Sequence, residues 1–312
     1  MSKSSPIVSP VVGLVGAVLA VSTGAILVRW SGAPSSVAAF YRVVFTTVPL
    51  LPVAVWRYRE AFARMRARDA AFAALSGVAL AVHFAAWFES LAWTSVAASV
   101  TLVQSQPVFV ALGAWGLLHE RVTRRTGVGI AVAVSGMVAM SLGDLLGGAF
   151  VGTRPVYGNG LALLGAVTAA GYVLAGRSLR QRLALIPYVV VVYGVCAAVL
   201  LGIVVGQGAP LTGYPPREWA VFVGLAVGPG LLGHTVLNWA LGHLESSVIS
   251  VSLLGEPVGA TVLAAVLLGE LPTRFTVVGG VVVLAGILLT TRARRGTERR
   301  ARPGGVDRRI AD

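Results

Sequence analysis

The chain has 312 residues, of which 56% are hydrophobic and only 12% are charged. A soluble protein of this length cannot bury so much apolar surface in its core, so the expected solvent is a lipid bilayer. The net charge of +13 does not indicate a nucleic-acid partner, because the basic residues follow a membrane-topology pattern instead.

Ten transmembrane helices are predicted, and no stretch is left over for a soluble domain. A spanning helix needs roughly 20 mostly apolar residues to cross a hydrocarbon core about 30 Å thick. The first stretch lacks a cleavage site behind it, so we expect a retained helix and not a signal peptide. The predicted spans are 11–28, 36–56, 70–93, 96–118, 126–142, 158–175, 186–205, 219–241, 248–268 and 276–291.

Basic residues are distributed unevenly between the predicted loops. With the N-terminus in the cytoplasm, twenty of the 25 Lys and Arg residues lie in cytoplasmic segments, four lie outside and Arg42 lies within a span. The positive-inside rule therefore predicts that both termini are cytoplasmic. The segment 292–312 is predicted to be a disordered basic tail that anchors the topology and can lie against membrane lipid.

The chain contains an internal repeat at a constant offset of 150 residues. A duplication explains this offset and predicts a first five-helix repeat at 1–144 and a second at 145–291. Because five is an odd number of spans, the second repeat would enter the membrane in the opposite orientation, an architecture common among carriers. The matching pairs are Pro107 with Pro257, Glu120 with Glu270, Thr126 with Thr276, Gly129 with Gly279, and Gly136 with Gly286.

Two histidines occupy matching places in the repeats. His83 lies 24 residues before Pro107, and His234 lies 23 residues before Pro257. An inverted two-fold axis would bring the third and eighth spans to the centre, with both imidazoles facing a shared cavity. The alternative role for each histidine is a hydrogen bond between helices.

One helical turn after each histidine, the same face of the span carries another distinctive side chain. Trp87 follows His83, and Asn238 follows His234, both at i, i+4 spacing. We expect them to give the cavity an aromatic wall and an amide.

Glu256 lies at the centre of the predicted ninth span, and its counterpart in the first repeat is the neutral Gln106. An ionisable group at membrane depth costs about 2.5 to 3.5 kcal/mol on insertion scales, so it needs a partner or a watery cavity. Two compatible roles follow: a carboxyl group that takes up and releases a proton during transport, or a buried pair with Arg42. Arg42 is correspondingly predicted to be a counter-charge or an anion contact.

Three prolines interrupt predicted spans and are the candidate hinges. Pro229, between two glycines, lies about one turn before His234 and marks either a hinge or a static kink. Pro107 and Pro257 prevent straight helices at equivalent places in the two repeats.

Glu120 and Glu270 lie where matching spans leave the membrane. At such positions, helix capping or interfacial ion pairing is a more probable role than solute contact.

Several segments resemble the EamA-type permeases of the drug/metabolite transporter superfamily. The likeness lies in "TSVAASVTLVQSQPVFVAL" and its partner "LLGEPVGATVLAAVLLGELPTRFTVVGGVVVLAG", and extends to "AAFYRVVF", "AVHFAAWFESLAWTSVA" and "GHTVLNWAL". The resemblance implies an all-α membrane protein with ten helices in two inverted repeats, in the plasma (inner) membrane of a prokaryote. It also implies export of amino acids, related metabolites or toxic compounds, often coupled to protons.

The sequence leaves two other functions as alternatives to a carrier. An intramembrane enzyme would need a nucleophile with a base or a metal constellation, and neither an H-E-x-x-H nor a G-x-S-x-G motif is present. A divalent-metal carrier could use His83, His234 and Glu256 as ligands. The preferred prediction is a secondary carrier without enzymatic activity or cofactor. Its expected partners are a small-molecule substrate and membrane lipid, without nucleic acid, and a homodimer is possible.

Overall fold

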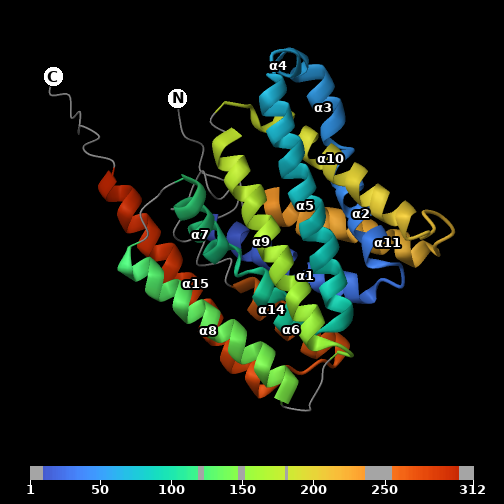
Figure 1. Cartoon of the computed structure of the whole chain (residues 1–312). Helices are drawn as coiled ribbons and strands as arrows, with labels where there is room; N and C mark the ends of the chain where they lie inside the picture. The colour runs from blue at the N-terminus through green and yellow to red at the C-terminus, as the bar shows by residue number, and fades with distance from the viewer. Residues whose placement is uncertain (1–9, 119–122, 147–151, 180–181, 236–254, 302–312) are drawn as a thin grey trace.

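The computed structural model describes residues 10–118, 123–146, 152–179, 182–235 and 255–301 (Figure 1). Within these ranges every regular element is a helix, in agreement with the predicted all-α class. The helices of the first half are α1 (Pro10–Trp30), α2 (Ser35–Thr47), α3 (Leu50–Arg57), α4 (Arg59–Ala63), α5 (Ala67–Trp93), α6 (Val96–Val103), α7 (Gln106–Leu118) and α8 (Arg124–Leu146). Those of the second half are α9 (Pro155–Leu179), α10 (Leu185–Gly206), α11 (Pro216–Leu225), the π-helix η1 (Ala226–Thr235), α14 (Gly255–Leu268) and α15 (Arg274–Ala301).

Several of these helices are long and apolar enough to cross a membrane. In the described part of the chain, five continuous segments meet this condition, and the pair α2–α3, bent by 41°, makes a sixth. The eighth and ninth predicted spans run into 236–254, which lies outside the described residues. The count of ten and the inverted orientation therefore stay predictions.

Two predicted spans are interrupted at proline positions. The predicted span 96–118 consists of α6 and α7, which are separated at Gln104 and Ser105. Pro107 is the second residue of α7, a position where its missing N–H costs no hydrogen bond. In the eighth span, α11 gives way to η1, and Pro229 lies inside this π-helix. A proline cannot donate the regular α-helical hydrogen bond, which favours such a change of pattern.

Helix α15 continues beyond the predicted end of its span. It runs to Ala301, so residues 292–301 are helical although the sequence indicated a disordered tail from 292 onward. The alanine and arginine residues of this stretch have high helix propensity, which supports continuation of the helix outside the membrane.

The two repeats begin their last helix with the same hydrogen-bonded cap. Thr123 Oγ1 accepts from the Thr126 N–H at 3.2 Å, and Thr273 Oγ1 accepts from the Thr276 N–H at 3.1 Å. The hydroxyl groups within each pair are also hydrogen-bonded, at 2.9 and 3.0 Å. This side-chain cap satisfies a backbone donor that the first turn leaves free.

The helices α8 and α15 pack along one another through glycines from both repeats (Figure 1). A Cβ atom on Gly136 would lie 2.7 Å from the backbone nitrogen of Val283 and 2.8 Å from the Gly279 oxygen. A Cβ atom on Gly286 would likewise meet the backbone of Ala133 and Gly129. The two sets of contacts are equivalent at the offset of 150, and they make the helices antiparallel.

The buried Glu218 connects its own helix, α11, to the loop that follows α1. Its carboxylate accepts hydrogen bonds of 2.8 Å from the Ser31 hydroxyl and from the Gly32 N–H. A neighbouring carboxylate, that of Glu270, accepts from the Val96 N–H at 2.5 Å and forms an ion pair with Arg29. The predicted capping and ion-pairing role of Glu270 is therefore confirmed, whereas Glu120 lies outside the described residues.

A similar tie joins α5 to the connection between α9 and α10. Asp69, in the first turn of α5, is 5% exposed and forms an ion pair of 3.1 Å with Arg182. Asp69 and Glu218 lie in the first turns of the helices that form the third predicted span of their half, and each binds the connection after the first long helix of the other half. The buried carboxylates of Asp69, Glu218 and Glu270 thus each connect the two halves.

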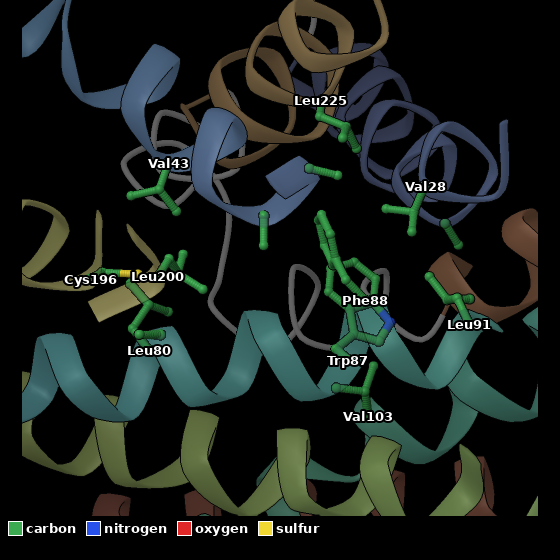
Figure 2. Packing of buried hydrophobic residues seen from close by; sticks show 14 of the residues in the cluster. Val28, Val43, Leu80, Trp87, Phe88, Leu91, Val103, Cys196, Leu200 and Leu225 are labelled. Atoms are coloured by element: carbon green, nitrogen blue, oxygen red, sulfur yellow. The ribbon is translucent and has the colours of Figure 1, made fainter. Parts of the chain in front are cut away.

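The main hydrophobic core surrounds α5, which packs against α9, α10 and α2. Figure 2 shows Trp87 and Phe88 next to one another on this helix, with Leu80 farther along it near Cys196 and Leu200 of α10. Bulky side chains of α5 therefore fill the centre of the molecule, close to the site described below.

The glycine contacts predict a specific sensitivity to small substitutions in α8. Gly136→Ala would place a methyl group against the backbone of α15, and overpacking of this kind typically costs roughly 1 to 3 kcal/mol. Gly127→Ala in the same helix is the matched control, because nothing lies within 4 Å of its Cβ position. We expect the thermal unfolding midpoint of the purified protein to fall for Gly136→Ala and to stay level or rise for Gly127→Ala. Equal midpoints would contradict the described packing.

Candidate functional site

A cavity of about 370 Å³ lies between helices from both halves of the chain. Its wall combines aromatic rings with two charged side chains, two amides and a few hydroxyl groups. The lining residues are Val21, Arg42, Val43, Thr46, Leu80, His83, Phe84, Trp87, Val103, Gln104, Gln106, Ala169, Tyr172, Val173, Tyr193, Pro229, Gly230 and Glu256.

Arg42 of α2 brings a buried cation to this cavity, since only 5% of the residue is exposed. Its guanidinium carbon lies 4.4 Å from the ring centroid of Phe84, 5.7 Å from that of Trp87 and 5.6 Å from that of Phe88. These rings come from one face of α5, at the i, i+3 and i+4 positions. Their electron-rich faces partly replace the hydration that the buried cation has lost.

Glu256, in the first turn of α14, brings a carboxylate to the same cavity. The side-chain amide of Gln104 donates a hydrogen bond to it. Gln104 is positioned for this contact by the interruption between α6 and α7. In the described part of the chain, Arg42 and Glu256 are not joined by an ion pair, although they are close enough to interact electrostatically.

Helix α14 reaches this position because glycines let it approach α1 closely. Ser22 of α1 donates a hydrogen bond of 3.4 Å to the Glu256 carbonyl oxygen. A Cβ atom on Gly259 would meet the Ser22 side chain, and one on Gly255 would lie 3.1 Å from Val18. Gly255 and Gly259, which form a G-x-x-x-G spacing, therefore face α1.

His83 and Trp87 lie together on the α5 wall of the cavity. Their rings are stacked, with centroids 5.9 Å apart and an angle of 24° between the planes. The His83 Nδ1 atom is 2.9 Å from the Gly165 carbonyl oxygen of α9. The carbonyl acts as an acceptor, so the neutral ring holds its proton on Nδ1 and presents Nε2 as its second polar atom.

The symmetric partners of these two residues fall largely outside the described part of the chain. The backbone of His234 belongs to η1, but its side chain and the whole of Asn238 lie outside the described residues. The pairing of two imidazoles across the cavity therefore stays a prediction.

The prolines differ in their relation to the site. Pro229 lines the cavity together with Gly230, whose Cβ position would be 3.0 Å from the Thr46 hydroxyl. Pro107 and Pro257 are not among the lining residues, although each directly follows one, Gln106 and Glu256 respectively. Hinge motion at any of the three remains a prediction.

Sequence reasoning missed several members of the site. Phe84, Tyr172 and Tyr193 line the cavity, but none of them was selected. Tyrosine combines an apolar ring with a polar hydroxyl group, so a tyrosine deep in an apolar span is the signal that could have found two of them. The bond of Gln104 to Glu256 depends on the break between α6 and α7, which hydropathy does not reveal.

The chemistry of the cavity suits a small dipolar solute better than a metal ion. It offers one guanidinium, one carboxylate, amides and aromatic surface within a space of about 370 Å³. Among the residues that the structure describes, no group of three His, Cys, Asp or Glu side chains lies close enough together to hold a metal.

Comparison with known proteins identifies the family. The model of the EamA-like transporter family matches twice, at residues 8–142 and 156–292. The chain belongs to the EamA-like transporter family. The resemblance read from the sequence is thereby confirmed, and the two halves are two copies of one family domain.

Relatives of this EamA-family protein are named as transporters. An uncharacterised transporter of Archaeoglobus fulgidus is 26% identical over 81% of this chain and 86% of its own length. A probable terminal-alkyne amino-acid exporter of Streptantibioticus cattleyicolor is 29% identical over 78% of this chain and 80% of its own. The pseudopaline exporter CntI of Pseudomonas aeruginosa is 26% identical over 70% and 74%, respectively.

A solved crystal structure supports the fold at low sequence similarity. It covers 92% of this chain and 98% of its own, with a TM-score of 0.60 and 21% identity. The family match shows that the protein is a membrane transporter, and the named relatives agree with this.

The position of the cavity predicts at which of two adjacent threonine positions an introduced cysteine can react with a water-soluble thiol reagent. Thr46 lines the cavity, whereas Thr47 is 7% exposed and lies in the protein interior. Each threonine hydroxyl donates a hydrogen bond to the backbone carbonyl four residues earlier, so the two substitutions remove equivalent hydrogen bonds. In a Cys196→Ala background, Thr46→Cys should react with a small methanethiosulfonate reagent and Thr47→Cys should not. Equal labelling of the two would show that the cavity is wrongly placed.

Proposed function

We propose that this EamA-family protein is a proton-coupled exporter of small metabolites such as amino acids or related compounds. The observation that carries the proposal is the presence of both Glu256 and Arg42 on the wall of one cavity without an ion pair between them. Charges that are not paired with one another are available for a solute and for protons. The names of two exporting relatives support the direction and the substrate class.

Glu256 is the proposed site of proton exchange. Its carboxylate receives a hydrogen bond from a neutral amide, which supports the group without fixing its charge. A proton and a cationic amino group would compete for the same carboxylate, so that entry of one requires release of the other. The inward proton gradient would then drive the solute outward.

Alternating access would come from two halves in inverted orientation. The antiparallel packing of α8 with α15 supports this arrangement, because its contacts are equivalent at an offset of 150 residues. The matching threonine caps and the two carboxylate ties between the halves support it further. Pro229, inside the π-helix on the cavity wall, is the proposed hinge nearest to the solute.

The proposed location is the plasma (inner) membrane of a prokaryote, with both termini in the cytoplasm. The relatives come from prokaryotes, and the distribution of basic residues between the loops gives the orientation. The divalent-metal alternative has less support, because among the described residues no group of three His, Cys, Asp or Glu side chains lies close enough together to hold a metal.

Loss of the Glu256 carboxylate should abolish export. Metabolites released by cells that express the wild type should include a defined set of amino-acid-like compounds, and Glu256→Gln should reduce these to the level of an empty vector. Glu60→Gln is the control, since the Glu60 side chain is 82% exposed and, among the described residues, forms an ion pair only with Arg64, four residues later. Membrane levels of all variants are matched by quantitative immunoblotting.

The possible results separate the parts of the proposal. If Glu256→Gln releases the same compounds as the wild type, Glu256 is not the coupling residue. If the wild type matches the empty vector, the protein is not an exporter under these conditions of growth and the export proposal is rejected.

A further inference from the structure

The buried guanidinium of Arg42 lacks a partner for part of its hydrogen-bonding capacity. Its Nη1 atom is fully buried and makes no hydrogen bond to a described residue. Guanidinium N–H groups cannot be deprotonated in a protein, so this donor persists in every state of the site. A buried charged donor without a partner is costly, and aromatic faces recover only part of that cost.

The donor lies at the cavity and not in a sealed core. Arg42 lines the cavity, and its guanidinium lies over Phe84, another lining residue. It also interacts electrostatically with Tyr193 and Glu256, which line the same cavity. A ligand in the cavity can therefore reach it.

Tyr193 of α10 supplies a second donor on the wall of the same cavity. Its side chain lines the cavity, and its hydroxyl group makes no hydrogen bond to another described residue. A planar guanidinium and a hydroxyl group that face one cavity can together bind the two oxygens of a carboxylate, which prefers short charge-assisted hydrogen bonds.

The rest of the wall limits which anion fits. Glu256 carries the opposite charge on the same cavity and would repel a second negative group placed near it. A solute that places a carboxylate at Arg42 and a cationic amino group at Glu256 satisfies both charges. Phe84, Trp87 and Tyr172 leave aromatic surface for an apolar substituent.

We propose that Arg42 and the Tyr193 hydroxyl form the subsite that binds the carboxylate of the transported solute, and that this solute is a zwitterion oriented with its amino group toward Glu256. The inference rests on the proposed export function and assigns the orientation of the solute in the cavity. A neutral compound or a simple amine of the same shape is rejected, because it leaves the guanidinium unpaired.

The test compares acids with their primary amides on the purified full-length protein. The probes are the twenty standard amino acids and the corresponding amino-acid amides, and the readout is the rise of the thermal unfolding midpoint that a ligand of the native state produces. We expect one or more acids to raise the midpoint and the matching amides to leave it unchanged. Equal shifts for an acid and its amide, or no shift with any acid, would overturn the proposal.

Substitutions then locate the effect at the subsite. Arg42→Gln should abolish the acid-induced rise, Arg42→Lys should reduce it because the planar fork is lost, and Tyr193→Phe should reduce it without changing the fold. Arg154→Gln is the matched control, since this exposed arginine lies over Trp93 and Tyr157 away from the cavity. The assignment is refuted if folded Arg42→Gln shows the full acid-induced rise of the unfolding midpoint. It is also refuted if the two single variants Tyr193→Phe and Arg42→Lys both show the full rise.

Failure of this inference can be told apart from failure of the exporter proposal. If wild-type cells release compounds that lack a carboxylate, and Glu256→Gln stops that release, then export stands and the carboxylate subsite is wrong. If acids bind through Arg42 while no compound accumulates outside the cells, the subsite stands and export is wrong.

Discussion

A buried guanidinium is the constraint on which the central cavity depends. Placing Arg42 inside a membrane protein without an ion pair requires other groups to face its charge, and three aromatic rings of α5 meet that requirement. Their positions fix which face of α5 points inward, and with it the location of His83. Glu256, Gln104 and Tyr193, which come from three other parts of the chain, add further polar groups to the wall of the same cavity.

Close backbone approach brings these groups within reach of one another. Helix α14 presents the Glu256 carboxylate because Gly255 and Gly259 let it lie against α1. The same device acts at the edge of the molecule, where Gly136 and Gly286 bring α8 and α15 together. Lipid provides no hydrophobic force to join helices, so such small-residue contacts and a few buried polar ties carry much of the association.

Much of this structure could be predicted from hydropathy and internal symmetry. The long spans of α1, α5, α9 and α10 follow from apolar length alone, and the offset of 150 pointed to the glycines that pack. Arg42, His83, Trp87 and Glu256 were found because polar or large groups are rare at membrane depth. The break at Gln104 was not predicted, because a two-residue interruption leaves the hydropathy of 96–118 almost unchanged. Tyr172 and Tyr193 were missed because a tyrosine in an apolar span hardly lowers the hydropathy of that span, although its hydroxyl group can face a polar cavity.

The π-helix η1 has a consequence for the history of the duplicated chain. Fourteen residues separate Asp69 from His83 in the first copy, whereas sixteen separate Glu218 from His234 in the second. A π-helix bonds each residue to one farther along than an α-helix does, so it takes up more residues in each turn. The ten residues of η1 can therefore absorb a two-residue insertion between the tie at the end of the helix and the cavity. The π-helical pattern of η1 therefore accommodates the two additional residues between Glu218 and His234 within a single helical segment.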